Sequence, residues 1–379
     1  MRGTGGGALN VTQPDSGARN QRSGGALPDG RGSVRCGLAR GGAKGRVLAG
    51  VLALACASVA GCERKGGAAG ESPLLYCSVD TEFAREVLAE YERRTGVKVR
   101  VIFDTEAAKT TGLVQRILDE EGQTGADLFW SNEIFNTILL SRRGRLAAYV
   151  SPAAADIPEA YKCAAGTWTA FGMRARVVAF DSAVTPRASL PTTWEAYAAP
   201  EWASKLAIAN PLFGTTRGHV AAAFALWGED RGRAYLERLR AGGAAVLDSN
   251  SATVRAVLSG NRVIAFTDTD DVIVARKQRP TLDMIYPDLG DGGTVLIPNS
   301  VAIVRGGAHR REAESLYDFL VSADVERMLA RSDSRNIPVR SALCEELGVT
   351  APPASKLTFA RVADALEASA QAAREILLK

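Results

Sequence analysis

The sequence predicts an α/β protein built as two lobes, and three observations support this. The chain has 379 residues, which is too long for one ordinary hydrophobic core. Hydrophobic residues make up 46% and charged residues 23%, which is the composition of a globular protein. From Pro73 onward, short apolar strands alternate with amphipathic helices. This alternation is typical of mostly parallel sheets covered by helices on both faces.

The first strand–helix block begins at Leu74 and ends at Gly144. After its first strand, Phe83, Val87 and Tyr91 recur at helical spacing, and a glycine at position 96 stops the helix. The block is predicted to contain strands at 74–79, 97–103 and 126–130, and helices around 83–91, 113–118 and 134–139.

The second block repeats this alternation and is longer. It is predicted to contain strands at 176–180, 205–210, 244–248, 262–266 and 294–304, and helices within 191–202, 219–228, 253–260, 312–322 and 359–378. We detect no internal repeat in the sequence, only two similar architectures.

The N-terminus has the layout of a secretory signal. Basic residues precede an apolar segment that ends in small residues and a cysteine, VAGC at 59–62, which resembles a bacterial lipobox. We expect residues 1–61 to be removed as leader and signal peptide, Cys62 to be lipidated, and 62–73 to form a flexible tether. A single transmembrane anchor is the alternative, but an apolar run of about 15 residues is short for a bilayer.

The charge and the cysteines change once this leader is set aside. Residues 1–61 hold eight basic and two acidic residues, so the rest of the chain carries −2 of the total +4. Nucleic-acid binding therefore loses its electrostatic basis. Cys77, Cys163 and Cys344 remain in an oxidising envelope, where an odd number allows one internal disulfide. Spacing does not choose the pair; we expect Cys163–Cys344.

Polar side chains follow five of the predicted strands. In open α/β sheets, ligands bind beyond the carboxyl ends of strands, against helix N-termini. Such residues are also what helix caps require, so capping is the alternative interpretation at each junction. The candidate ligand-binding residues are Asp80; Asn132 and Glu133; Thr215, Thr216 and Arg217; Ser249, Asn250 and Ser251; and Thr269, Asp270 and Asp271.

The junction FTDTDDV, at 266–272, holds more carboxylates than a cap needs. Asp268 is the simplest cap of the following helix, and Asp270 and Asp271 remain. Adjacent acids repel each other unless a cation or a hydrogen-bond donor offsets the repulsion, so the surplus predicts a cation-facing site. The GTTRG loop at 214–218 instead favours an anion. Together they suit a metal with a partner anion, or a zwitterion.

Motifs typical of enzymes are missing. The sequence contains no HExxH, CxxC or GxSxG motif. It also contains no Walker loop, since the glycine- and lysine-containing segment GGAKGR lies in the leader. Its two histidines are His219 and His309. We therefore expect no enzyme, with an envelope hydrolase that uses His219 as a remote alternative.

The ordered set of segments resembles the extracellular solute-binding proteins of the ferric-iron-binding type, which supply ABC importers. The resemblance covers nearly all of residues 73–379. It rests on the lipobox, LLYCSVDTEFAREVLAEYERRTGVKV, GADLFWSNE, AGTWTAFGMRARVVAFD, PTTWEAYAAPEWASKLAIANP and IPVR before a long helix.

The resemblance implies a type II periplasmic-binding-protein fold with a ligand cleft between two lobes that close by a hinge motion. The implied lobes are 74–174 plus 295–337, and 175–294 plus 338–379. The chain would cross between them near 173–178, 295–299 and 337–340. The implied function is a lipid-anchored, monomeric binding protein in the cell envelope, working with a permease and an ATPase.

The resemblance also implies a ligand set. Ferric-binding relatives use a residue after the first strand, a glutamate after the ADVF-like strand and two adjacent tyrosines. These positions fall near Asp80, at Asn132 or Glu133, and near Asp270 and Asp271. The implied metal ligands are Asp80, Glu133, Asp270 and Asp271, and the implied ligand is Fe(III) with a synergistic anion. Arg174 and Arg176 match basic residues that hold this anion in some relatives.

This chain departs from the family at the tyrosine pair, which two aspartates replace. Carboxylate oxygens still suit hard cations. A phosphonate-like zwitterion, or an organic cation such as a polyamine or thiamine, remains an alternative ligand. Trp130 and Trp168 could pack on such a ligand, but a role in the core or on a lobe surface is the favoured interpretation of both. A periplasmic ligand sensor remains an alternative role.

Overall fold

The computed structural model describes residues 72–104, 111–119 and 125–379. Every described residue belongs to one compact unit, Arg64–Lys379. The predicted leader, the lipidation site Cys62 and most of the tether therefore lie outside the described residues.

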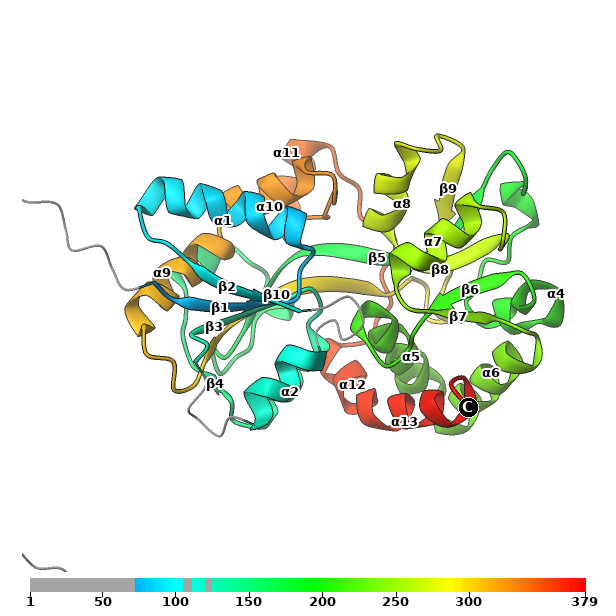
Figure 1. Ribbon diagram of the computed structural model, residues 1–379, viewed down its shortest axis with the longest axis horizontal. Helices are drawn as coiled ribbons and strands as arrows, with labels where there is room; N and C mark the ends of the chain where they lie inside the picture. The colour runs from blue at the N-terminus through cyan, green and yellow to red at the C-terminus, as the bar shows by residue number, and fades with distance from the viewer. Residues whose placement is uncertain (1–71, 105–110, 120–124) are drawn as a thin grey trace, which may run out of the picture. The chain divides into compact units, whose positions relative to one another are not determined.

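The described part of the chain contains one mixed sheet of ten strands (Figure 1). Its strand order is β2-β1-β3-β10-β5-β8-β6-β7, with β4 paired to β10 and β9 paired to β5. The strands are β1 Leu74–Cys77, β2 Arg100–Phe103, β3 Leu128–Ser131, β4 Leu146–Ala147, β5 Thr169–Asp181, β6 Leu206–Ala209, β7 Ala245–Leu247, β8 Ile264–Asp268, β9 Leu282–Ile285 and β10 Leu296–Val304.

Strand β5 joins the two halves of this sheet. Its first half pairs antiparallel with β10, which pairs with β3, and its second half pairs antiparallel with β8. The strands at either side are parallel: β1 with β2 and β3, and β6 with β7 and β8. The carboxyl ends of β1 and β3, and of β6, β7 and β8, therefore provide the loops that can form a site.

The helices follow the predicted alternation, which confirms the α/β class. Helix α1 shows the reason: Phe83, Val87 and Tyr91 are buried, and Gly96 ends the helix with a φ of 72°. The helices are α1 Thr81–Thr95, α2 Thr111–Asp119, α3 Phe135–Arg142, α4 Pro200–Ala203, α5 Gly214–Trp227, α6 Glu229–Ala241, α7 Asn250–Leu258, α8 Thr269–Arg276, α9 Arg310–Leu320, α10 Ala323–Arg331, α11 Ser341–Leu347, α12 Phe359–Asp364 and α13 Leu366–Ile376.

Two predicted helices are interrupted. Residues 191–202 form a 3₁₀ turn at Glu195–Ala198 and the short α4, because Ala199 before Pro200 takes an extended backbone conformation. The expected single helix at 359–378 is two helices that meet at Ala365, whose N–H bonds to the Val362 carbonyl three residues back.

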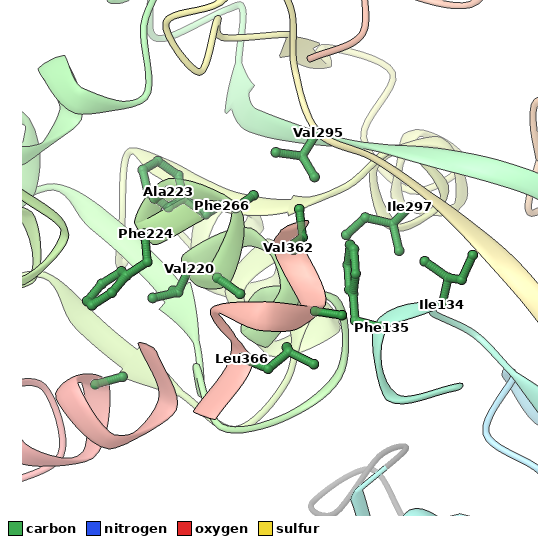
Figure 2. Close-up of a cluster of buried hydrophobic side chains, with 14 of the residues drawn as sticks. Ile134, Phe135, Val220, Ala223, Phe224, Phe266, Val295, Ile297, Val362 and Leu366 are labelled. Carbon is green, nitrogen blue, oxygen red and sulfur yellow. The ribbon is translucent and has the colours of Figure 1, made fainter. Parts of the chain in front are cut away.

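The largest hydrophobic cluster connects α3, α5, α12 and the sheet (Figure 2). Phe135 and Ile134 face Val362 and Ile297 in this cluster. Helix α5 reaches α3 closely because Gly218 has no side chain: a Cβ there would lie 2.3 Å from Cε2 of Phe135. The helix that begins at Gly214 is thus packed directly against α3.

The structure also bears on the predicted disulfide and on the question of a membrane span. Cys77, Cys163 and Cys344 are all free thiols, so the expected Cys163–Cys344 disulfide is not formed. Among the described residues, no helix combines the length and the apolar character needed to cross a membrane.

Candidate ligand-binding site

A cavity of about 510 Å³ lies at the carboxyl ends of the strands. On one side it is lined by the start of α1 and by Asn132 after β3. On the other side the loops after β6, β7 and β8 and the starts of α5, α7 and α8 line it. The cavity therefore lies where the sequence placed its five polar junctions.

Most of the candidate residues meet in this cavity. The residues that line it are Asp80, Asn132, Arg174, Thr215, Thr216, Ser249, Asn250, Ser251, Asp270 and Asp271. The other four, Glu133, Arg176, Arg217 and Thr269, are buried but are not among its lining residues.

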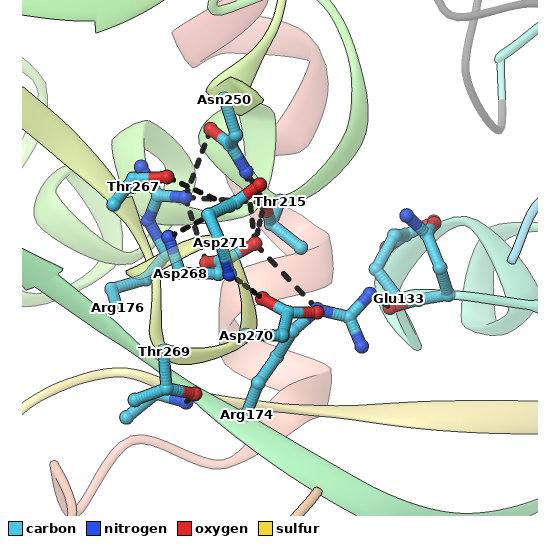
Figure 3. A network of polar contacts seen from close by, with 12 residues as sticks. Glu133, Arg174, Arg176, Thr215, Asn250, Thr267, Asp268, Thr269, Asp270 and Asp271 are labelled. Carbon is cyan, nitrogen blue, oxygen red and sulfur yellow. Dashed lines mark hydrogen bonds and ion pairs between the residues drawn. The ribbon is translucent and has the colours of Figure 1, made fainter. Parts of the chain in front are cut away.

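Asp268 forms the centre of a buried polar network (Figure 3). Its carboxylate accepts hydrogen bonds from Arg176 Nη1 at 2.8 Å, Thr215 Oγ1 at 2.6 Å and Asn250 Nδ2 at 2.9 Å. These partners come from β5, α5 and α7, so this one carboxylate ties three elements to the end of β8. Asp268 also lines the cavity.

Asp271 supplies a capping carboxylate at this junction. Asp268 is the residue at which α8 is capped, as expected from its position. The Asp271 carboxylate accepts from the Asp268 backbone N–H at 3.3 Å and from the Thr267 hydroxyl at 2.7 Å. The Asp268 side chain completes this capping box and also accepts from the polar network, so Asp268 is the cap that the sequence predicted, and Asp271 shares in the capping.

Asp270 faces the cavity and a single nearby guanidinium. Its Oδ2 lies 3.6 Å from Arg174 Nε, and its Oδ1 accepts from the backbone N–H of Asp271 at 3.0 Å. Burial, opposed by Arg174 and reinforced by Asp268 and Asp80, raises the pKa of Asp270 to about 6. Near neutral pH it is therefore a buried carboxylate that a cation can stabilise.

The pKa of Asp271 is raised, as is that of Asp270. Burial, together with repulsion from Asp270 and Asp268, raises the pKa of Asp271 well above its usual range. Oxygen atoms of Asp268, Asp270 and Asp271 lie within 4.8 Å of one another. These three carboxylates are the group that could share a metal ion.

Glu133 has a structural partner instead of facing the cavity. Its carboxylate accepts from the backbone N–H of Phe135 at 2.7 Å and of Asn136 at 3.2 Å, at the start of α3. Burial raises the pKa of Glu133, and those backbone donors oppose the shift. At this junction it is the neighbouring Asn132 that lines the cavity.

Arg217 and Thr269 also bond to the surrounding protein. Arg217 donates to Asn136 Oδ1 at 3.0 Å and forms an ion pair with Glu367 at 2.8 Å. The Thr269 hydroxyl accepts from the Ala175 backbone N–H at 3.3 Å. Arg217 therefore ties α5 to α3 and α13, and the expected anion side of the GTTRG loop is left to Thr215 and Thr216.

The wall made by α5 and α7 is polar and internally bonded. Thr216 Oγ1 donates to Asn250 Oδ1 at 3.2 Å, and the Ser249 and Ser251 hydroxyls lie 2.9 Å apart. Ser249 also accepts from the Ala252 backbone N–H and so caps α7. This wall combines hydroxyls with two helix N-termini, which suits oxygen atoms of an anion.

The charge of the lining decides which kind of ligand fits. Carboxylates outnumber guanidiniums six to two: the first are Asp80, Glu82, Asp248, Asp268, Asp270 and Asp271, and the second are Arg174 and Arg255. An excess of negative charge in a partly buried cavity favours a cation over a free anion.

Aromatic side chains contribute little to the lining. Phe83 and Phe213 are the aromatic residues among the lining residues. Trp130 is completely buried against Phe171, with ring centroids 5.9 Å apart, and Trp168 belongs to the hydrophobic core. Both tryptophans are therefore used in the core, which confirms the role that the sequence favoured over packing on an organic ligand.

Several lining residues were not chosen from the sequence as ligand residues. They are Glu82, Asn210, Asp248, Arg255, Asp268 and Gln278. Asn210 and Asp248 end predicted strands and could have been found by the same rule as their neighbours. Arg255 and Gln278 lie inside or after helices, and no local signal in the sequence distinguishes them.

The chain is similar to known binding proteins. Residues 124–367 match a family model described as bacterial extracellular solute-binding protein. Iron uptake protein A1 of Synechocystis is 23% identical over 269 residues, covering 68% of this chain and 73% of that protein.

Solved structures share the fold. The iron-bound HitA of Pseudomonas aeruginosa superposes with a TM-score of 0.71 at 21% identity, covering 80% of this chain and 99% of that one. The periplasmic binding protein AfuA of Actinobacillus pleuropneumoniae, with fructose-6-phosphate bound, gives 0.70 at 17% identity, covering 81% and 99%. Of these two structures with the same fold, one thus holds iron and the other fructose-6-phosphate.

Proposed function

The chain belongs to the bacterial extracellular solute-binding proteins, and we propose that it captures a hard metal cation for an ABC importer. Its fold is the two-lobed α/β fold of the ferric-binding periplasmic proteins. Ferric iron is the leading candidate, held with a partner anion. The observation that carries this proposal is the excess of carboxylates in the cavity lining.

The residues divide between the two parts of such a ligand. Asp270, with Asp268, Asp271 and Asp80, would face the cation, since hard cations prefer oxygen ligands. Thr216, Ser251 and the starts of α5 and α7 would face the anion. Iron uptake protein A1 and the iron-bound HitA support iron as the cation.

Two other ligand classes fit the lining less well. A sugar phosphate such as that bound to AfuA carries negative charge, which the six carboxylates disfavour. An organic cation is usually recognised by aromatic faces, of which this cavity offers few. The charge and the scarcity of aromatic side chains therefore favour a metal.

The cellular setting completes the proposal. Cleavage before Cys62 and lipidation of that cysteine would anchor the protein in the envelope through the 62–73 tether. The lobes 74–174 plus 295–337, and 175–294 plus 338–379, would close over the ligand and deliver it to a permease and an ATPase. Deleting the gene would then reduce cation uptake, whereas deleting a ligand sensor would leave uptake intact and change signalling.

A ligand panel tests the cation. The purified protein is melted with ferric citrate, citrate alone, Mn²⁺, Ca²⁺, fructose-6-phosphate, spermidine and thiamine, and its metal content is measured by elemental analysis. A ligand at 100 times its Kd adds about 2.7 kcal/mol to the free energy of unfolding, which corresponds to several degrees. The proposal fails if no metal salt moves the melting temperature while an organic ligand does.

A further inference from the structure

Arg174 has an unusual position in the cavity. It lies on β5, its side chain is 7% exposed, and it lines the cavity wall. Its Nη2 donates to the Asn132 carbonyl at 2.7 Å, and its Nε lies 3.5 Å from Asp268 Oδ2 and 3.6 Å from Asp270 Oδ2. Figure 3 shows the guanidinium beside Asp270, on the side toward Glu133.

The two arginines of β5 have different electrostatic roles. Arg176 is completely buried and is paired with Asp268 at 2.8 Å, within the polar network behind the cavity. Arg174 is the guanidinium that pairs with Asp270. Burial disfavours its charge, but Asp270, Asp268, Asp80 and Asp271 together raise the pKa of Arg174, so it remains a cation.

We propose that Arg174 is a tethered counter-cation that competes with the cargo for Asp268 and Asp270. This inference rests on the proposed function and names the residue that sets its selectivity. A metal ion bound to these carboxylates would lie only a few ångströms from the guanidinium, where two positive charges repel strongly in a partly buried site. Loading is therefore an exchange, in which the cargo displaces the guanidinium from the two aspartates.

The exchange has a consequence for selectivity. Every cation must offset the loss of the Arg174 contacts, so only a cation with strong carboxylate binding occupies the site. Divalent ions that bind carboxylates weakly are therefore kept out. By contrast, the resemblance to ferric-binding proteins assigns Arg174 to the anion, and that role predicts no tighter cation binding when Arg174 is removed.

Binding of Mn²⁺ alone, without an added anion, distinguishes the two roles. Free Mn²⁺ is followed by electron paramagnetic resonance in titrations of the parent, Arg174→Gln and Arg174→Lys. The account predicts that Arg174→Gln binds Mn²⁺ at least tenfold more tightly than the parent. A nearby charge changes the free energy of a charged group by at least about 1.4 kcal/mol, which is equivalent to one pKa unit and to a tenfold change in affinity. Arg174→Lys keeps the charge and stays close to the parent.

Arg85→Gln is the matched control, because Arg85 is exposed on α1 and is not among the residues that line the cavity. It should change Mn²⁺ affinity by less than threefold. If Arg174→Gln binds Mn²⁺ as weakly as the parent or more weakly, the counter-cation role is wrong. The proposed function is not affected by that result as long as the parent binds a metal in the ligand panel. If the parent binds no metal in that panel, both fail.

A measurement on the parent covers the case in which Arg174→Gln does not fold. In the structure of the metal-loaded parent, the distances from Arg174 Nε to Asp268 and Asp270 should exceed the ion-pair range of about 4 Å. A metal bound to these aspartates with both distances unchanged contradicts the exchange.

Discussion

Three aspartates at the β8–α8 junction have three different roles. Asp268 joins β8 to Arg176, Thr215 and Asn250, Asp271 accepts from the N–H of residue 268, and Asp270 faces Arg174 across the cavity wall. Each role follows from the direction in which the side chain leaves the first turn of the helix. Asp268 is paired with Arg176 at 2.8 Å, whereas Asp270 lies 3.6 Å from its guanidinium partner Arg174, so Asp270 gains more from a bound cation than Asp268 does.

Asp270→Asn should stabilise the ligand-free protein at pH 7.5 by on the order of 2–3 kcal/mol. The pKa of Asp270 is raised to about 6 in the folded protein, above its ordinary 3.8. Between these values the folded state binds more protons, so this group lowers stability as pH rises through that window. The gain from the substitution should be small at pH 4.5 and complete by pH 7.5, measured by urea unfolding with a chelator present.

Asp230→Asn, at an exposed position, provides the control and should change the free energy of unfolding at pH 7.5 by less than about 0.5 kcal/mol. If Asp270→Asn is less stable than the parent at pH 7.5, the Asp270 carboxylate stabilises the ligand-free protein as a partner of Arg174. It is then not a buried charge that destabilises the protein until a cation binds.

The sequence identified residues at the site better than it identified their roles. Strand ends and helix starts placed most of the candidates in the cavity, because the carboxyl ends of neighbouring strands converge. Roles depended on distant partners: Arg176 lies 92 positions from Asp268, and Glu133 is used by the backbone of α3. Local spacing does not contain such contacts.

At the scale of elements, α5 serves both the site and the core. Its first turn, from Gly214 to Thr216, lines the cavity, and its next turn docks against α3 through Gly218 and Arg217. Arg217 fixes this contact by donating to Asn136 on α3. The wall of the cavity is therefore positioned by packing on the far side of the same helix.

Gly218→Ala should destabilise the protein by about 1–3 kcal/mol, since the added Cβ would lie 2.3 Å from the Phe135 ring. Urea unfolding measures the loss. Adding Phe135→Leu should recover part of it, because the shorter side chain leaves room for the methyl group.

Gly125→Ala is the matched substitution, because its Cβ would meet only Leu74 at an ordinary 3.5 Å. It should change the free energy of unfolding by less than about 0.5 kcal/mol. Equal losses in the two variants would contradict close packing of α5 on α3.

Periodicity predicted most elements, and the exceptions have physical causes. In α1, α9 and the strands, the apolar positions of the sequence pattern are the positions that are buried in the structure. The helix expected within 191–202 was wrong because Pro200 forces its predecessor into an extended conformation. Strand β5 is longer than the predicted 176–180 because its first half pairs with β10, a contact between segments more than 100 residues apart.

At the scale of the whole described unit, three segments meet beside Glu326. Its buried carboxylate accepts from the backbone N–H of Gly172 on β5 and of Val339, both at 2.8 Å, and from Arg340 at 2.9 Å. Nearby, Met173 pairs with Ile337, and the β10 register shifts at Pro298/Asn299. These positions coincide with the crossings implied by the resemblance, so we propose them as the hinge.

Glu326→Gln should cost about 3–4 kcal/mol in urea unfolding, because it leaves the buried Arg340 without one of its two carboxylate partners. The exposed pair of Arg327 and Glu346 supplies the comparison, and Glu346→Gln should cost less than about 1 kcal/mol. If the two variants lose similar amounts of unfolding free energy, Glu326 does not hold the three segments together.

Length and alternation predicted two lobes, but not how they are joined. The order β3-β10-β5-β8 places the long antiparallel strands in the middle of the sheet. Such an order depends on pairings between distant segments, which composition and periodicity do not encode.

The central claim is that the carboxylates at the start of α8 bind a cation, and calorimetric titration with ferric citrate tests it most directly. The parent should bind, and citrate alone should give no comparable heat. Asp270→Asn combined with Asp271→Asn should weaken binding at least a hundredfold while the protein remains folded by circular dichroism, since charged hydrogen-bonding partners contribute about 1.5–3 kcal/mol each. Binding by the double variant as tight as that of the parent would contradict the account.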